Sequence, residues 1–250
     1  MKFLIGDIGN TSTKICVLNK KFQILRSYNF DTSKIYKGNL LKDIIRKKIN
    51  KNINPVFLFS SVVPKVYKSI KKNLNKNKYK IYEIKELNLN KLIKINIKNK
   101  KQLGSDRIAN AIGAKKYKNS LVLDFGTATT FDFIKNGVYE GGVIAPGVKL
   151  SIKNLSQATA LLPMINLKSN QNSYGKNTIE ALNAGFVWGY EGLINNIISK
   201  IISKNKIKCK ILLTGGYAKF FKKVIKRKVL IDQDITVKGI ANAYKELIWV

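Results

Sequence analysis

The sequence predicts a mixed α/β protein built from two related halves around a cleft. The main observation is a repeated stretch. Residues 3–15, FLIGDIGNTSTKI, and residues 121–133, LVLDFGTATTFDF, both place an aspartate, a glycine and several hydroxyls after an apolar strand. The matching positions, each at an offset of 117 residues, are Asp7 and Asp124, Gly9 and Gly126, and Thr13 and Thr130. A repeat at close to half of a 250-residue chain indicates a duplicated unit.

The first half is predicted to run from three strands into alternating helices and strands. We expect strands over 2–6, 13–19 and about 22–30, with a turn over 8–12. The apolar spacing then predicts a helix over 38–50, a buried strand over 55–64, a helix over 65–74, a strand over 79–84 and a helix over 104–117 that starts near Ser105 or Asp106. This order gives a mixed sheet with helices packed on it.

The second half repeats this opening and then adds longer helices. Strands are expected over 121–126, 129–134 and 139–147. The remaining predicted elements are a helical region over 148–160, a long helix over 177–202, a strand over 210–216, a helix over 217–225, a strand over 228–232 and a final helix over 238–250. No linker rich in Ser or Pro separates the halves. We therefore expect two tightly packed domains, residues 1–117 and 118–250.

Charge is the most extreme property of the composition. Lys and Arg number 47 against 14 Asp and Glu, which gives a formal net charge of +33. Such a chain can bind nucleic acid or another anionic surface. Here, however, the lysines are scattered among Asn and Ile, as an AT-rich coding sequence would supply, and Arg, the better residue for bidentate phosphate contacts, is rare. We expect nonspecific binding at low salt and no specific nucleic-acid partner.

Other features of the composition exclude several classes of protein. The absence of histidine rules out His-based triads and His metal sites. No apolar run approaches the ~18–20 residues that span a bilayer, and the N-terminus is typical of a strand rather than a signal peptide. Cys16 and Cys209 fit no metal-ligand spacing. The sequence predicts a cytoplasmic protein, with no membrane partner, whose catalysis depends on carboxylates, hydroxyls, Lys, Arg, backbone amides and an added metal.

The two repeated turns have the chemistry of phosphate sites. A turn that contains Gly and follows a strand points several backbone N–H groups in one direction, which favours an anion. Further donors come from neighbouring hydroxyls, namely Thr11, Ser12, Thr13, Thr127, Thr129 and Thr130. A carboxylate beside a phosphate needs an intervening cation, so Asp7 and Asp124 indicate metal or water-bridged metal. The pair predicts a nucleotide held in the cleft; two ordinary hairpins are the simpler alternative.

Three further segments favour ligand binding. Gly215 and Gly216 lie between a strand and a helix, where a base or ribose can approach the backbone, although a plain turn is the alternative. The stretch GGVIAPG at 141–147 is expected either at the cleft floor or in a simple connection. Asp106 and Arg107 stand together at a helix start. They form either an ordinary cap or a carboxylate base beside a guanidinium that binds an acidic substrate.

These segments, in this order and spacing, resemble the type III pantothenate kinases. The stretches that carry the resemblance lie between residue 3 and at least residue 218: DIGNTSTK, GSDRIANAIGA, DFGTATTFD, GGVIAPG, YGKNTIEALNAGFVWGYEGLI and LLTGGYA. That family has the acetate/sugar kinase–actin fold, two RNase H-like domains around a cleft. The resemblance implies ATP-dependent phosphorylation of the pantothenate hydroxyl to 4'-phosphopantothenate, the first step toward coenzyme A.

The resemblance implies roles for the substrate segment. This segment consists of Gly104, Ser105, Asp106 and Arg107. Asp106 would take the proton from the pantothenate hydroxyl, and Arg107 would hold the pantothenate carboxylate. Thr178, in GKNTIE, would also reach the substrate. The family forms homodimers whose substrate pocket lies near the subunit interface.

The resemblance also implies ATP and cation sites. The first phosphate loop would consist of Asp7, Ile8, Gly9, Asn10, Thr11, Ser12, Thr13 and Lys14. Asp7 would organise Mg²⁺ through water. Asp124 would bind a monovalent cation, potassium or ammonium, and Thr127 would contact an ATP phosphate.

The chain departs from the family at the approach to the substrate segment. Ile97 stands where many relatives have an aromatic residue, NKK at 99–101 replaces their Asn-Pro-Arg, and Ser105 stands where they often have Ala. Two other functions stay open: a kinase of another small hydroxy acid, and a nucleic-acid-binding transcriptional relative. The carboxylates of the motifs favour catalysis, because a pure binding protein needs neither a base nor two cation sites.

Overall fold

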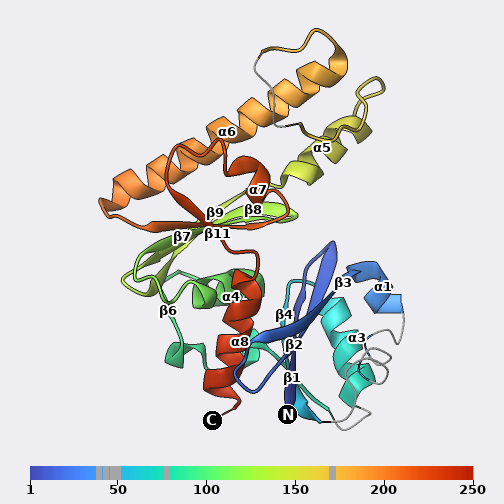
Figure 1. Cartoon of the computed structure of the whole chain (residues 1–250), viewed down its shortest axis with the longest axis vertical. Helices are drawn as coiled ribbons and strands as arrows, with labels where there is room; N and C mark the ends of the chain where they lie inside the picture. Colours follow the sequence, from blue (N-terminus) through green and yellow to red (C-terminus); the bar gives the residue numbers. More distant parts are fainter. Residues whose placement is uncertain (38–40, 42–44, 46–51, 76–78, 169–172, 250) are drawn as a thin grey trace. The chain divides into compact units, whose positions relative to one another are not determined.

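The protein forms two compact units in a computed structural model that describes residues 1–37, 41, 45, 52–75, 79–168 and 173–249 (Figure 1). Unit 1 consists of Met1–Lys116, Gly137–Tyr139 and Asp234–Val250. Unit 2 consists of Tyr117–Asn136 and Glu140–Gln233. The chain first passes from unit 1 to unit 2 between Lys116 and Tyr117, next to the domain boundary expected at residue 117. The sequence predicts the C-terminal segment in the second domain, 118–250, whereas Asp234–Val250 lies in unit 1.

Unit 1 is built on a five-stranded mixed sheet. Its strands are β1 (Lys2–Ile8), β2 (Ser12–Leu18), β3 (Ile24–Asp31), β4 (Ile53–Ser61) and β5 (Lys80–Glu83). They lie in the order β3-β2-β1-β4-β5. The first three strands pair antiparallel, whereas β4 pairs parallel with β1 and β5. The predicted three-strand opening is confirmed.

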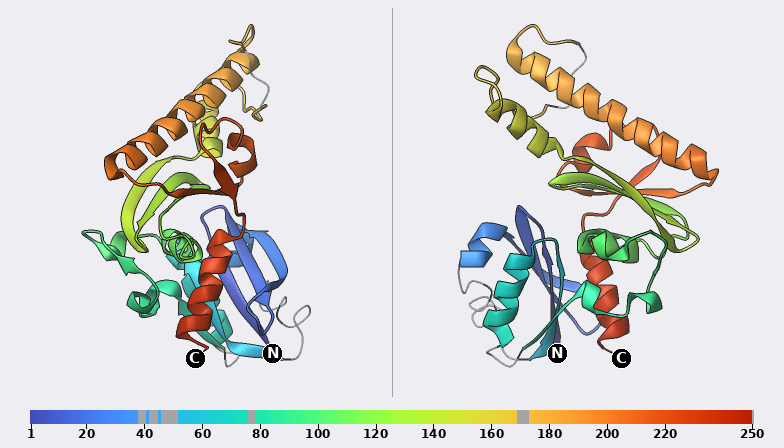
Figure 2. Two further views of the ribbon diagram at one scale, coloured as in Figure 1. Left: turned by 60° about the vertical axis from the view of Figure 1, so that its left-hand side comes forward. Right: turned by 180° about the vertical axis from the view of Figure 1, so that it is seen from behind.

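Helices cover both faces of this sheet (Figure 2). On one face, α1 (Thr32–Lys37) and α3 (Pro64–Asn75) enclose an apolar core that includes Phe57 and Phe59. On the other face, α8 (Ile235–Leu247) packs on β1, and α4 (Ser105–Gly113) packs on β4.

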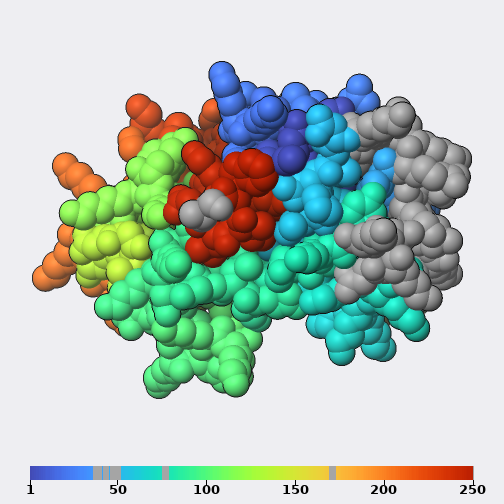
Figure 3. Space-filling model, turned by 90° about the horizontal axis from the view of Figure 1, so that it is seen from below, coloured from blue at the N-terminus to red at the C-terminus, as the bar shows by residue number. Residues whose placement is uncertain are grey.

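The two helices on the second face are in close contact. A Cβ on Gly239 of α8 would lie 1.8 Å from the Ala109 carbonyl oxygen of α4, so only a glycine allows the backbones to approach this closely. Figure 3 shows the C-terminal helix (red) beside the first strands (blue) and the segment around residue 100 (green). This contact places the end of the chain in unit 1.

Most of the helix predicted over 38–50 lies outside the described residues. Leu41 and Ile45, which are described, are buried in the core under α3. The sequence did not predict α1, the short strand β6 (Lys94–Ile95) or the 3₁₀ turns η2 (Ile84–Glu86), η3 (Leu89–Lys91) and η4 (Lys100–Gln102).

Unit 2 repeats the strand order of unit 1. Its strands are β7 (Ser120–Phe125), β8 (Ala128–Lys135), β9 (Val138–Pro146), β10 (Lys210–Gly215) and β11 (Val229–Ile231), in the order β9-β8-β7-β10-β11. The first residues of β9, which belong to unit 1, pair with β6. In each sheet the strand that carries the repeated aspartate lies at the centre, between an antiparallel and a parallel neighbour. The predicted duplication is therefore confirmed.

One face of the second sheet is covered by helices. They are α5 (Val148–Gln157), α6 (Thr178–Asn205) and α7 (Ala218–Phe221), which share a core with β7, β8 and β10 (Figure 1). In the described part of the chain no helix, α6 included, has the length and apolar character needed to cross a membrane.

Helix α7 is shorter than the predicted 217–225. The Asn195 side chain explains the early end. Its amide donates to the Val224 carbonyl at 2.9 Å, and its oxygen accepts the Lys226 N–H at 3.0 Å. These bonds hold the chain in a turn. The final helix α8, in contrast, begins three residues earlier than predicted.

Candidate functional site

The first repeated turn lies at the carboxyl end of β1 in unit 1. Gly9 N–H donates to the Ser12 carbonyl at 3.0 Å and closes the turn. Thr32, at the start of α1, fixes it from the side: its hydroxyl donates to the Gly9 carbonyl at 2.7 Å, and its N–H donates to the Thr11 carbonyl at 3.0 Å. The backbone of this turn is therefore held in one conformation before any ligand binds.

The predicted loop residues differ in what they can offer a ligand. Ile8 is fully buried in the core, and the buried Thr13 hydroxyl lies 3.0 Å from the Thr32 hydroxyl, so both residues can offer only backbone groups. The turn residues whose side chains are exposed are Asn10, Thr11 and Ser12. Exposed hydroxyls and an exposed amide on a tight turn suit an anion.

Asp7 and Lys14 face each other across β1 and β2. They are direct partners in the antiparallel register, so their side chains lie on the same face of the sheet. The Lys14 ammonium forms an ion pair with Asp234, at 2.6 Å between Nζ and Oδ1. Asp234 immediately precedes α8. Because both partners are partly exposed, the pair adds little stability and serves mainly to fix the Lys14 ammonium.

Asp106 lies in the first turn of α4, at the same edge of the sheet. Its carboxylate folds back over Gly104, where a Cβ would lie 2.5 Å from Oδ1, and it accepts the Arg107 N–H at 2.8 Å. Gly104 in turn approaches Val62, directly after β4, the parallel neighbour of the strand that carries Asp7. Burial raises the pKa of Asp106, and the Arg107 N–H and charge oppose this shift.

The start of α4 is tied to η2 by a residue that the sequence reasoning missed. The buried Ser105 hydroxyl hydrogen-bonds the Glu83 carboxylate, which also accepts the Lys85 N–H at 2.9 Å. Glu86 accepts the Glu83 N–H at 3.2 Å and completes a capping box. Burial raises the pKa of Glu83. No local pattern marks Glu83, because its partner lies 22 residues further along the chain.

The second repeated turn lies at the carboxyl end of β7 in unit 2. Gly126 N–H donates to the Ala128 carbonyl at 3.1 Å, and Gly126 and Thr127 are exposed. Asp124 is half-buried, and its register partners are Thr130 in β8 and Thr214 in β10. A carboxylate flanked by two hydroxyl residues supplies oxygen ligands of the kind that hard cations prefer.

Two glycine-rich segments lie in contact with this second turn. A Cβ on Gly147 would lie 2.0 Å from the Thr127 carbonyl oxygen. Gly215 has φ +83°, and a Cβ there would lie 2.7 Å from Asp124 Oδ1. Gly216 N–H donates to the Phe125 carbonyl at 3.1 Å. The segments GGVIAPG and TGG thus belong to the same site as the turn, and both need glycine for close backbone contact.

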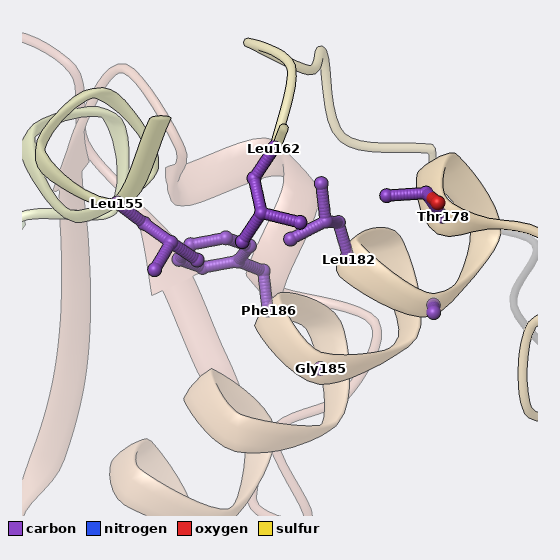
Figure 4. Close-up of a pocket in the computed structure, with 7 residues that line it drawn as sticks. Leu155, Leu162, Thr178, Leu182, Gly185 and Phe186 are labelled. Atoms are coloured by element: carbon purple, nitrogen blue, oxygen red, sulfur yellow. The ribbon is translucent and has the colours of Figure 1, made fainter. Parts of the chain in front are cut away.

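Thr178 lies at the other end of unit 2, in the first turn of α6. It is exposed and lines an open apolar pocket of about 360 Å³ (Figure 4). The figure shows Leu155, Leu162 and Phe186 lying against one another, with Leu182 and Thr178 projecting from α6 beside them. The complete lining is Leu155, Leu162, Thr178, Ala181, Leu182, Gly185 and Phe186. The polar atoms of this pocket are few, so it suits an apolar surface rather than a phosphate.

The donor set fits a divalent metal that is shared with phosphate. Within the described ranges no three His, Cys, Asp or Glu side chains cluster closely enough to hold a metal ion. Mg²⁺ typically needs only one or two carboxylates, together with phosphate oxygens and water. Asp7, half-buried beside the first turn, matches that requirement.

Comparison with known proteins gives consistent results. The sequence model of the type III pantothenate kinases matches residues 3–200. A type III pantothenate kinase of Pelagibacter ubique (strain HTCC1062) is 50% identical over 243 residues, which cover 96% of this chain and 97% of that protein.

Two solved structures resemble the fold. A structure named for the Baf family of transcriptional activators, from Campylobacter jejuni, has a TM-score of 0.63 at 20% identity and covers 97% of this chain and 98% of its own. The activator of 2-hydroxyisocaproyl-CoA dehydratase from Clostridium difficile, with bound ADPNP, has a TM-score of 0.54 at 11% identity, covering 98% and 95%. At these identities the likeness shows the fold alone.

Proposed function

The chain belongs to the type III pantothenate kinase family and phosphorylates pantothenate in coenzyme A biosynthesis, and we propose that Asp106 is the general base of this reaction. The observation that supports this role is a half-buried carboxylate in the first turn of α4, and its partial burial raises its pKa. A raised pKa makes a carboxylate a stronger base than free aspartate. The chain contains no histidine to take this role.

In this proposal the site residues of unit 1 have separate roles in binding and catalysis. Arg107 holds the pantothenate carboxylate through charge-assisted hydrogen bonds. Asp106 accepts the proton of the substrate hydroxyl as its oxygen attacks the γ-phosphorus of ATP. Asp7 holds the water shell of Mg²⁺, which, when bound with ATP, neutralises charge on the phosphates. The exposed backbone and hydroxyl groups of the first turn hold phosphate oxygens.

In unit 2 we assign the second turn to ATP and to a monovalent cation. Thr127 is exposed at the tip of the turn, where its hydroxyl can reach a phosphate oxygen. Asp124 lies half-buried between hydroxyl residues and would bind potassium or ammonium. The close contacts of Gly147 and Gly215 with this turn support the assignment. Because neither residue has a side chain, a ligand at the turn can approach their backbone directly.

The test is pantothenate-dependent ADP release from ATP in Mg²⁺, with K⁺ or Na⁺ as the only monovalent cation. We expect faster turnover in K⁺, by tenfold or so, the usual scale of coupling between two bound ligands. Asp124→Asn should turn over slowly in both salts and lose the difference between them. The control is Asp31→Asn, an exposed carboxylate paired with Lys34. Equal K⁺ activation in wild type and Asp124→Asn would remove Asp124 from the cation site.

We also propose that the protein is a homodimer through the α5–α6 surface of unit 2. The large apolar side chains exposed on α5, on α6 and on the segment that joins them are Leu150, Leu155, Leu161, Met164, Tyr174, Ile179 and Trp188. Many exposed large apolar side chains, together with an apolar pocket between α5 and α6, are typical of a protein–protein interface. Thr178 lines the pocket, which supports the prediction of a substrate-binding residue near the interface.

The dimer proposal predicts that Leu161→Glu shifts the protein toward monomer. Leu161 is 89% exposed, so the change costs little within one subunit, whereas an unpaired carboxylate inside an interface is strongly unfavourable. Light scattering after size exclusion measures the shift, and thermal unfolding checks the fold. Leu25→Glu, at a half-exposed site in β3 of unit 1, is the matched control. A wild-type monomer, or a Leu161→Glu dimer of unchanged affinity, contradicts the proposal.

We place the reaction in the cytoplasm. Cys16 and Cys209 are both free thiols, as expected in a reducing compartment. Burial raises the pKa of Cys16 to about 11, so this thiol stays protonated and unreactive.

A further inference from the structure

Ser60 carries a buried hydroxyl that the fold does not use. The residue is fully buried near the end of β4, and its Oγ has no hydrogen-bond partner among the described residues. Its neighbour behaves differently, because the Ser61 Oγ accepts the Val63 N–H at 3.2 Å and shapes the turn before α3. Buried polar groups without partners are rare in native proteins and often mark a functional position.

The position of Ser60 in the sheet identifies its neighbour. Ser60 is the direct partner of Asp7 in the parallel β1–β4 register. Phe57 and Phe59 point into the core under α3, so the alternation of the strand directs Ser60 to the opposite face, where α4 and α8 pack. Asp7 lies on this same face. Neighbouring strands are about 4.8 Å apart, a gap that one hydrogen bond between the two side chains can bridge.

The burial of Ser60 also limits what its partner can be. A ligand or solvent molecule cannot reach a fully buried hydroxyl directly. We therefore seek its partner among protein groups that can change rotamer when the metal site is occupied. Carboxylates that organise a metal are themselves usually oriented by a further hydrogen bond.

We propose that Ser60 is a positioning residue for Asp7, and that its hydroxyl donates to the Asp7 carboxylate when the carboxylate turns to organise Mg²⁺ with ATP. This inference rests on the proposed role of Asp7. In this arrangement the hydroxyl is unpaired in the free protein and paired in the complex. Ser60 therefore slightly lowers the free energy of unfolding of the ligand-free protein and raises its affinity for Mg·ATP.

The experiment compares Ser60→Ala with Ser120→Ala. Ser120 is also fully buried and its Oγ has no partner in the described structure, but it starts β7, at the opposite end of that strand from Asp124. Thermal unfolding of the free proteins and calorimetric titration with ATP, in Mg²⁺ or in EDTA, give the readouts. Both variants should unfold at or above the wild-type temperature. Only Ser60→Ala should bind Mg·ATP more weakly, by about 10–100-fold, with ATP binding in EDTA unchanged.

Two results would overturn the proposal. The first is a lower unfolding temperature for Ser60→Ala than for Ser120→Ala, which would show that Ser60 has a structural partner in the free protein. The second is unchanged Mg·ATP affinity in Ser60→Ala, or no Mg·ATP binding by wild type. A wild-type protein that binds Mg·ATP but does not phosphorylate pantothenate would contradict only the assignment of pantothenate as substrate. The effect of Ser60→Ala on Mg·ATP binding would still be measurable.

Discussion

Asp106→Asn is expected to lower kcat for pantothenate phosphorylation by about 10²–10⁴-fold, the usual contribution of a general base. The amide keeps the size of the side chain and can still accept the Arg107 N–H, but it cannot take a proton. ATP affinity should stay within about twofold. Steady-state kinetics with both substrates, together with nucleotide titration, measure the two effects separately. Turnover within tenfold of wild type would exclude Asp106 as the base.

The same variant has a predictable effect on stability. Burial raises the pKa of Asp106, so the folded protein holds this proton more tightly than the unfolded chain does. The free energy of unfolding therefore falls as the pH rises from the ordinary aspartate pKa through the raised one. At neutral pH the ionised carboxylate opposes folding. Asp106→Asn should unfold at or above the wild-type temperature, which separates loss of the base from loss of structure.

The pH profile gives an independent check on Asp106. The base works only when it is ionised, so kcat should fall as the pH drops through the raised pKa. The acidic limb should lie above the ordinary aspartate range, and Asp106→Asn should lack it. An acidic limb that persists in the variant would belong to another group.

Gly147→Ala is expected to have the second-largest effect, on both activity and stability. The new Cβ would lie 2.0 Å from the Thr127 carbonyl oxygen, so either the second turn or the start of α5 must move. A displacement of about 1 Å at a binding loop can cost on the order of 10²-fold in rate. Overpacking typically costs a further ~1–3 kcal/mol of folding free energy. We expect a higher KM for ATP together with a lower kcat.

The control for this variant is Gly192→Ala in α6, where an added Cβ meets nothing within 4 Å. Alanine favours a helix over glycine by about 1 kcal/mol, so the control should be at least as stable as wild type and equally active. Wild-type kinetics for Gly147→Ala would show that the close contact with Thr127 does not shape the site.

Local patterns in the sequence were enough to predict the repeated sheets. The strands that carry Asp7 and Asp124, and the start of α4 at Ser105, depend on alternation, turn residues and apolar spacing within a few neighbours. These features are encoded in the segment itself, so they can be read without knowledge of the rest of the chain. The family and its reaction followed from the same motifs and are confirmed by the comparisons.

Contacts between distant residues could not be predicted in this way. Asp234 was missed because its partner, Lys14, is 220 positions away, and Ser60 was missed because nothing in a strand sequence reveals an unused hydroxyl. The early end of α7 depends on Asn195, which belongs to another helix. In each case tertiary packing, rather than local propensity, decides the outcome.

The return of the last helix to unit 1 has a consequence for biosynthesis. The N-terminus of a chain leaves the ribosome first, and domains generally fold in the order from the N-terminus to the C-terminus. Here the first sheet emerges early, but α8, which covers Phe3 through Tyr244 and supplies Asp234 to Lys14, is made last. Unit 2, whose residues end at Gln233, is complete before that helix appears. The first-synthesised unit is therefore the last to finish folding, and a nascent chain halted before residue 234 exposes the apolar face that α8 would cover.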